Sequence, residues 1–125
     1  MRILVVDDDP VAGEMTQAVL EGLGHAVQWV ENGLDALQAL DSGNDFAMIV
    51  SDMNMPLLSG IDLFRELRER GDDRPFILLT GDEPEGPLAR EPRLDGCLTK
   101  DFTLEESLSG MIDDVLARHR HAAQA

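Results

Sequence analysis

The sequence predicts a single α/β domain with a doubly wound parallel sheet. Short apolar runs alternate along the chain with segments in which apolar residues recur every three or four positions, a pattern typical of strands joined by helices. The apolar runs are nearly continuous, as expected for strands that are buried on both faces. The length of 125 residues corresponds to one domain.

Five runs are predicted to be strands. Ile3–Val6 is rich in β-branched residues and is expected to lie inside the sheet, whereas Gln28 interrupts the second run, which is expected near an edge. The predicted strands cover residues 3–6, 26–30, 46–50, 76–79 and 96–99.

Helices are predicted after four of these strands from apolar residues at helical spacing. These positions are Val11, Met15, Val19 and Leu23, then Leu34, Leu37 and Leu40, then Ile61, Phe64 and Leu67, and finally Leu104, Leu108, Met111, Ile112 and Val115. The residues expected as N-caps are Asp9, Ser59 and Thr103, and those expected to end helices are Gly24, Gly43 and Gly71.

Two segments depart from this regular pattern. The stretch between Thr80 and Lys100 contains three prolines, so its helix is expected to be short or irregular, and mobile. Residues 118–125 show no apolar periodicity and are expected to form a frayed tail, which leaves residues 1–117 as the ordered domain.

Charge and cysteine content exclude several classes of function. The net charge is −15, from 10 basic and 25 acidic residues, which argues against binding to nucleic acid or to an anionic membrane surface and is compatible with a bound cation or a positively charged partner. Cys97 is the only cysteine, so no disulfide forms within the chain and a reducing cytoplasm is expected. No apolar run reaches the length of a membrane span.

Polar side chains follow the predicted strands where ligands bind in an open parallel sheet, beyond the carboxyl ends. These residues are Asp7, Asp8 and Asp9 after the first strand, Ser51 and Asp52 after the third, Thr80 after the fourth and Lys100 after the fifth. If the first and third strands are neighbours, their carboxylates meet, and a hard cation such as Mg²⁺ would relieve the repulsion between them. Asp9, followed by Pro10, is expected to be a helix cap instead.

Four segments resemble the receiver domains of bacterial response regulators, of the chemotaxis regulator type. They are the run ILVVDDDP at residues 3–10, the run IVSDMNMP at 49–56 followed by Ser59 and Gly60, the run LLTG at 78–81, and Lys100. The resemblance covers residues 2 to about 116 in the family's order. It implies a flavodoxin-like sheet of five strands in the order 2-1-3-4-5 and five helices. The prolines between Thr80 and Lys100 depart from the family pattern and predict a degraded fourth helix.

The resemblance also implies a role for each residue of the site. Asp52 would accept a phosphoryl group from a phosphohistidine of a sensor histidine kinase or a phosphotransfer protein, and the chain would signal by a change of shape to an unknown target rather than act as a turnover enzyme. Mg²⁺ would be held by Asp8, Asp52 and the main-chain carbonyl of Asn54, with Asp7 acting through water. Lys100 and Thr80 would bind the phosphoryl oxygens.

The chain departs from the family pattern at two positions near the lysine. Cys97 stands where the family usually has an aromatic switch residue, which puts the usual coupling between that ring and Thr80 in doubt. Asp101 replaces the proline that normally follows the lysine, so the bond between Lys100 and Asp101 is predicted to be trans.

Two other functions stay open from the sequence. The spacing of Asp7, Asp9 and Val11 also resembles the first motif of haloacid-dehalogenase-type phosphatases, in which Asp7 would be the nucleophile and Asp9 a general acid. The altered switch positions are also compatible with a receiver-like interaction module that phosphate does not switch.

Overall fold

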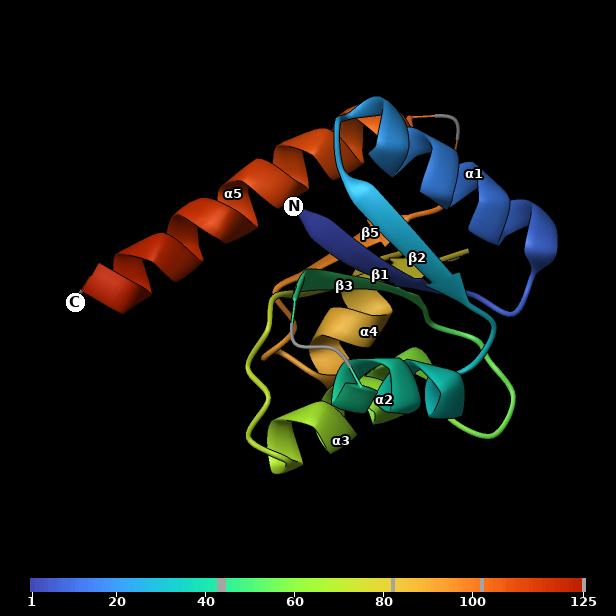
Figure 1. Ribbon diagram of the computed structural model, residues 1–125, viewed down its shortest axis with the longest axis horizontal. Coiled ribbons are helices and arrows are strands. Elements are labelled where there is room, and N and C mark those ends of the chain that lie inside the picture. The colour runs from blue at the N-terminus through green and yellow to red at the C-terminus, as the bar shows by residue number, and fades with distance from the viewer. Residues whose placement is uncertain (43–44, 82, 102, 125) are drawn as a thin grey trace.

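The computed structural model describes residues 1–42, 45–81, 83–101 and 103–124, and within these ranges five strands alternate with five helices (Figure 1). The strands are all parallel and lie in the order β2-β1-β3-β4-β5, which confirms the predicted fold and topology. They span Arg2–Val6 (β1), Ala26–Val30 (β2), Phe46–Asp52 (β3), Phe76–Thr80 (β4) and Gly96–Thr99 (β5). The helices span Pro10–Gly22 (α1), Gly33–Ser42 (α2), Gly60–Glu69 (α3), Glu85–Arg90 (α4) and Leu104–Gln124 (α5).

The helices form two layers, one on each face of the sheet (Figure 1). One core cluster joins α1 and α5 to the sheet through residues such as Leu20 and Leu108, and the other joins α2, α3 and α4 to its opposite face. In the second cluster the rings of Phe64 and Phe76 pack edge to face with their centroids 5.3 Å apart. The central strands are therefore buried on both sides, which explains their unbroken apolar sequences.

The predicted buried face of α1 is partly wrong. Val11 and Met15 are 75% and 47% exposed, and the buried residues of the helix are Gly13, Thr16 and Leu20. The reason is a side chain from another element, because the indole of Trp29 lies against Gly13 and occupies the space beneath this part of the helix. In α2, Leu37 and Leu40 are buried as predicted, whereas Leu34 is exposed.

Several predicted element ends are confirmed, and others lie a little further along. Asp9 caps α1 by accepting from the main-chain nitrogen of Val11 at 3.0 Å, and Ser59 caps α3 in the same way. Strands β3 and β4 run on to Asp52 and Thr80, so these two site residues belong to the strands rather than follow them. Gly43, predicted to end the second helix, lies outside the described residues.

The fourth helix is short, as its prolines predict: α4 covers only Glu85–Arg90. The carboxylate of Glu91, which follows the last residue of α4, connects this helix to neighbouring residues. It accepts hydrogen bonds from Arg65 of α3 at 3.0 Å and from Arg93 at 2.8 Å, and its side chain is 5% exposed. The hydrogen bonds from Arg93, above all, lower the pKa of Glu91 from 4.5 to about 2. The predicted mobility of this segment stays a prediction.

Glu91 is expected to make the stability of the domain fall at acid pH. Its pKa is lower in the folded state, so its contribution is complete above its unfolded pKa and disappears as the pH falls through its folded pKa. Because Arg93 is largely exposed, water screens the pair and the contribution is about 1–2 kcal/mol, less than the full shift implies. Chemical denaturation from pH 7 to pH 2 should therefore show a steeper loss for the wild type than for Glu91→Gln. Parallel curves for the two proteins would contradict this assignment.

Residues 118–124, predicted to belong to a frayed tail, continue α5, which runs to Gln124, and the fraying itself stays a prediction. The first residues of this segment are held by polar contacts with the loop before β5, which apolar periodicity does not reveal. Arg118 donates to the main-chain oxygen of Asp95 at 2.8 Å, and a ring nitrogen of His119 lies 2.9 Å from the Asp95 carboxylate. The domain boundary at residue 117 stays a prediction, and Ala125 lies outside the described residues.

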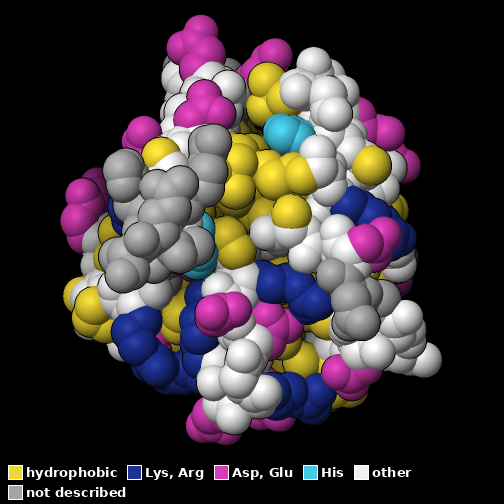
Figure 2. Space-filling view, turned by 60° about the vertical axis from the view of Figure 1, so that its left-hand side comes forward, with side chains coloured by type: hydrophobic (Ala, Val, Ile, Leu, Met, Phe, Trp, Pro, Cys, Tyr) yellow, Lys and Arg dark blue, Asp and Glu magenta, His cyan; other side chains and the backbone are white. Residues whose placement is uncertain are grey.

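The surface mixes charges of both signs. On the side where the N-terminus and the end of α5 lie, hydrophobic side chains gather in a hollow, and Lys and Arg side chains are interspersed with Asp and Glu below it (Figure 2). In the described part of the chain, no helix combines the length and the apolar character that crossing a bilayer requires.

Candidate functional site

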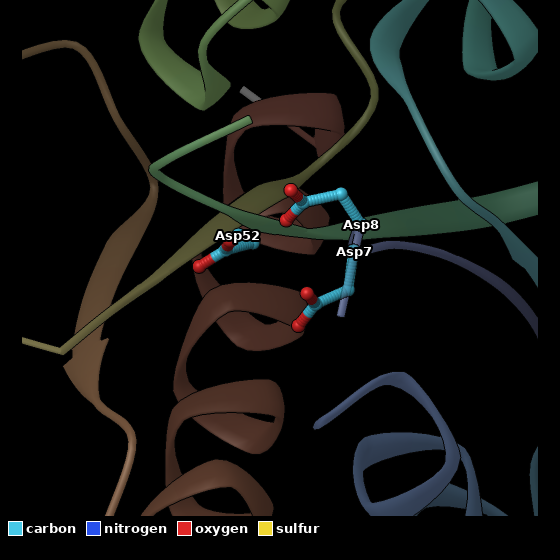
Figure 3. A group of neighbouring side chains, drawn as sticks. All are labelled: Asp7, Asp8 and Asp52. Atoms are coloured by element: carbon cyan, nitrogen blue, oxygen red, sulfur yellow. The ribbon is translucent and has the colours of Figure 1, made fainter. Parts of the chain in front are cut away.

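Three carboxylates converge at the carboxyl edge of the sheet. Asp7 and Asp8 follow β1 directly, Asp52 ends the neighbouring strand β3, and the register pairs Val6 with Ser51. Their side chains turn to the same side, and one oxygen from each lies within 4.8 Å of the others (Figure 3). Asp7 and Asp52 are buried, whereas Asp8 is exposed. The structure thus brings together the three acidic residues that the sequence predicts to meet.

Lys100 completes this group from the end of β5. Its Nζ atom lies 2.7 Å from Oδ2 of Asp7 and 2.8 Å from Oδ1 of Asp52, so that one ammonium group bridges two carboxylates. The main-chain nitrogen of Lys100 donates to the carbonyl of Thr80 at 2.8 Å, which fixes the start of the loop relative to β4. The only lysine of the chain is therefore the cation of this site.

Burial and ion pairing act against each other on the titration of this pair. Burial raises the pKa of Asp52, and the hydrogen bond and charge of Lys100 offset this only in part, so the net shift is upward. Burial alone would lower the pKa of Lys100, but its hydrogen bonds with Asp52 and Asp7 outweigh that effect and the net shift is again upward. Lys100 therefore stays protonated at neutral pH.

Each polar atom of Asp7, in the main chain and in the side chain, takes part in a hydrogen bond. Its main-chain nitrogen donates to Val30 at 3.1 Å, and its main-chain oxygen accepts from Nε1 of Trp29 at 2.9 Å. Its carboxylate accepts from the main-chain nitrogen of Asp9 through Oδ1, at 3.0 Å, and from Lys100 through Oδ2. A carboxylate whose two oxygens are both engaged is poorly placed to attack phosphorus, which disfavours the phosphatase hypothesis. Trp29 is a site contact that the apolar pattern of its strand did not reveal.

Thr80 and Asn54 lie on a common pocket beside the acidic group. The pocket has a volume of about 230 Å³ and is lined by the loop after β3, the end of β4, Glu83 in the loop before α4, and residues of α4 such as Arg90. Thr80 is buried at the end of β4, and Asn54 is exposed. The structure thus places both predicted residues at the same edge of the sheet as Asp52.

Cys97 and Asp101 differ from the remaining site residues. Cys97 pairs with Leu78 in the sheet, faces the α2–α3–α4 layer and is 5% exposed. Burial, with a smaller effect from Glu85, raises its pKa to about 11, so it is an inert apolar side chain rather than a nucleophile. No cis peptide bond occurs among the described residues, which confirms the predicted trans bond between Lys100 and Asp101.

The donor set suits a hard divalent cation. Three carboxylates gather oxygen atoms that could bind a cation directly or through water, and the exposed Asp8 leaves part of the group open to the water that Mg²⁺ retains in protein sites. The buried Asp52 carboxylate, next to a protonated amine, could act as a nucleophile toward an electrophile whose negative charge a cation and Lys100 neutralise.

Comparisons with known proteins agree with this geometry. The family model described as "Response regulator receiver domain" matches residues 3–112. The response regulator MprA of Mycobacterium avium is 37% identical over 113 residues, which cover 89% of this chain and 49% of the relative. The chain therefore spans about half the length of the curated relatives it matches.

Solved structures show the same fold. The response regulator TrrA of Thermotoga maritima, in complex with Mg²⁺-BeF, is 32% identical with a TM-score of 0.81 over 91% of this chain and 97% of that one. The chemotaxis response regulator CheY4 of Vibrio cholerae is 27% identical with a TM-score of 0.79 over the same shares of the two chains.

Proposed function

The chain belongs to the response regulator receiver family, and on this premise we propose that Asp52 accepts a phosphoryl group in a Mg²⁺-dependent reaction. The observation that carries the proposal is the bridging position of Lys100, whose ammonium group lies 2.8 Å from Asp52 and 2.7 Å from Asp7, next to a group of carboxylates that also includes Asp8. A nucleophile and the charges that would neutralise an incoming phosphate are thus within reach of one another.

The transfer follows from this arrangement. A carboxylate oxygen of Asp52 attacks the phosphorus of a phosphohistidine, and the new O–P bond forms as the N–P bond to the donor imidazole breaks. The electron pair of that bond remains on the imidazole nitrogen, which takes a proton from solvent. Lys100 shifts from pairing with Asp52 to pairing with the phosphoryl oxygens, and the hydroxyl of Thr80 donates to one of them.

Asp8, Asp52 and the main-chain carbonyl of Asn54 would hold Mg²⁺, with Asp7 acting through water. The bound cation would supply the neutralisation of oxygen charge on which phosphoryl transfer mainly depends. The Thermotoga relative, solved in complex with Mg²⁺-BeF, supports this assignment.

The phosphodonor we propose is a sensor histidine kinase or a histidine phosphotransfer protein, and the chain is a phosphoacceptor that signals by a change of shape. This reaction consumes the acceptor stoichiometrically, so the domain is not a turnover enzyme. We propose a cytoplasmic location, consistent with a single reduced cysteine, and no binding to nucleic acid by these 125 residues, consistent with a net charge of −15.

Phosphorylation with a small phosphodonor tests the acceptor assignment. We expect wild-type protein incubated with acetyl phosphate and Mg²⁺ to gain the mass of one phosphoryl group, and Asp52→Asn to gain none, because an amide oxygen is too weak a nucleophile. Asp114→Asn, which changes an exposed aspartate on α5, is the matched control and should behave as the wild type.

Each other outcome of this experiment is informative. An adduct that persists on Asp52→Asn and disappears on Asp7→Asn would support the phosphatase-like chemistry of Asp7. No adduct on the wild type would favour the second candidate, an interaction module that phosphate does not switch. That candidate rests on the small, inert Cys97 of β5, which provides no aromatic ring to respond to Thr80.

A further inference from the structure

We infer that Trp29 is a positioning residue for the acidic site, holding the Asp7–Asp8 peptide in the orientation that cation binding requires. The inference rests on the proposed function, because it concerns the affinity of that site for Mg²⁺. Trp29 lies on β2, at the edge of the sheet, and its side chain reaches across to the end of β1.

The contact is a hydrogen bond from the indole to the backbone. Nε1 of Trp29 donates to the main-chain oxygen of Asp7 at 2.9 Å. The ladder between β1 and β2 already uses the main-chain nitrogen of Asp7, which donates to Val30 at 3.1 Å. The indole therefore satisfies the carbonyl at the point where β1 leaves the sheet, and it does so from a rigid ring packed in the α1–α5 core cluster.

This carbonyl belongs to the peptide group that carries the nitrogen of Asp8. Fixing the carbonyl fixes the plane of that peptide, and with it the direction in which the Asp8 side chain leaves the backbone. Asp8 is exposed, and in the described part of the structure its carboxylate accepts no hydrogen bond. Its position is thus set through the backbone, on which the indole acts directly.

The approach of the indole depends on the glycine at position 13. A Cβ atom added to Gly13 would lie 2.5 Å from both Cε2 and Nε1 of Trp29, too close for any real contact. Glycine inside a helix is otherwise unfavourable compared with alanine. Because position 13, in the first turn of α1, has no side chain, the indole of Trp29 can approach the helix backbone this closely.

A matched pair of variants in α1 tests whether the position of the Trp29 indole affects Mg²⁺ binding, without removing the tryptophan. Gly13→Ala displaces the indole, whereas Gly22→Ala adds the same methyl group in the same helix where nothing lies within 4 Å. We expect Gly13→Ala to bind Mg²⁺ about three- to tenfold more weakly than the wild type by isothermal titration calorimetry, and Gly22→Ala to bind as the wild type does. Helix propensity alone would favour alanine at both positions.

A second pair isolates the hydrogen bond itself. Because Trp29 is the only tryptophan, its analogues can be incorporated at this one position. Benzothienylalanine has the shape of tryptophan with sulfur in place of the N–H group, and 5-fluorotryptophan retains that group. We expect the sulfur analogue to weaken Mg²⁺ binding about threefold or more and the fluorinated one to leave it unchanged. In the wild type, Mg²⁺ should also change the fluorescence of Trp29, and Asp8→Ala should abolish that change.

The outcomes separate this inference from the proposed function. If Mg²⁺ does not bind the wild type, or binds Asp8→Ala equally well, the proposed site itself is wrong. If Mg²⁺ binds through Asp8 but Gly13→Ala and the sulfur analogue bind it as tightly as the wild type, Trp29 is only a core residue and the inference is overturned. Lower thermal stability without a change in Mg²⁺ affinity would likewise overturn it.

Discussion

Replacing Lys100 by methionine is expected to slow phosphoryl transfer to Asp52 by about 10²- to 10³-fold, the usual effect of removing one preorganised donor from a site where negative charge develops. Methionine keeps a side chain of similar length but has no ammonium group. Since Lys100 is the only lysine, and its Nζ atom lies 2.7 Å from Asp7 and 2.8 Å from Asp52, no other lysine can take its place. The rate is measured by intact mass during incubation with acetyl phosphate at saturating Mg²⁺.

The same variant should make the stability of the domain more dependent on Mg²⁺. Without Lys100, Asp7 and Asp52 face one another with no counter-charge in a largely buried site, which we expect to lower the free energy of unfolding by about 2–3 kcal/mol in the absence of metal. A cation bound to the same carboxylates restores much of this loss, so Mg²⁺ should stabilise Lys100→Met more than the wild type.

Lys100→Arg is the control, because it retains the charge while changing the shape of the donor. It should preserve most of the metal-free stability and lose part of the transfer rate. An unchanged rate in Lys100→Met would mean that the ammonium group does not contact the transferred phosphoryl group.

Replacing Gly60 by alanine is expected to lower the free energy of unfolding by about 3 kcal/mol, at the upper end of the cost of overpacking a core. Gly60 opens α3 and packs against the end of β3, with its main-chain nitrogen donating to the carbonyl of Met53 at 2.9 Å. An added Cβ atom would overlap the main-chain oxygen of Asp52 and the side chain of Leu78, and would lie 3.1 Å from Cα of Met53. Two of these neighbours are backbone atoms, which cannot move aside as a flexible side chain does.

Because the backbone of Asp52 would have to shift, the same substitution should also reduce phosphorylation. The control is Gly110→Ala in α5, where nothing lies within 4 Å of the added atom, and helix propensity should stabilise the protein by about 0.5–1 kcal/mol. Urea denaturation measures the change in the free energy of unfolding for Gly60→Ala and for Gly110→Ala. If Gly60→Ala is as stable as the wild type, α3 does not pack on the acceptor strand as closely as the structure shows.

Predictions from the sequence succeeded where neighbouring residues carry the information. Continuous apolar runs place β1, β3 and β4 within two residues of their observed ends, because strands buried on both faces consist largely of apolar residues. Asp9 and Ser59 were identifiable as caps because a cap acts on main-chain groups two or three positions away. The meeting of Asp7, Asp8 and Asp52 followed because parallel strands bring their carboxyl ends to one edge and the resemblance implied that the first and third strands are neighbours.

The remaining features depend on contacts between residues far apart in the chain. The buried face of α1 is decided by Trp29 of another strand, and helical periodicity could not reveal that an indole fills the space facing Gly13. Polar contacts between distant elements also decide two other features. Glu91 at the end of α4 pairs with Arg65 of α3, and Arg118 of α5 donates to Asp95. Such pairs leave no periodic pattern in the sequence. The sequence by itself determined the strands and the polar residues at their ends, and its resemblance to the receiver family supplied the strand order. Which side chains pack against which was decided only by the tertiary structure, because close packing depends on the shapes of partners that the local pattern does not specify.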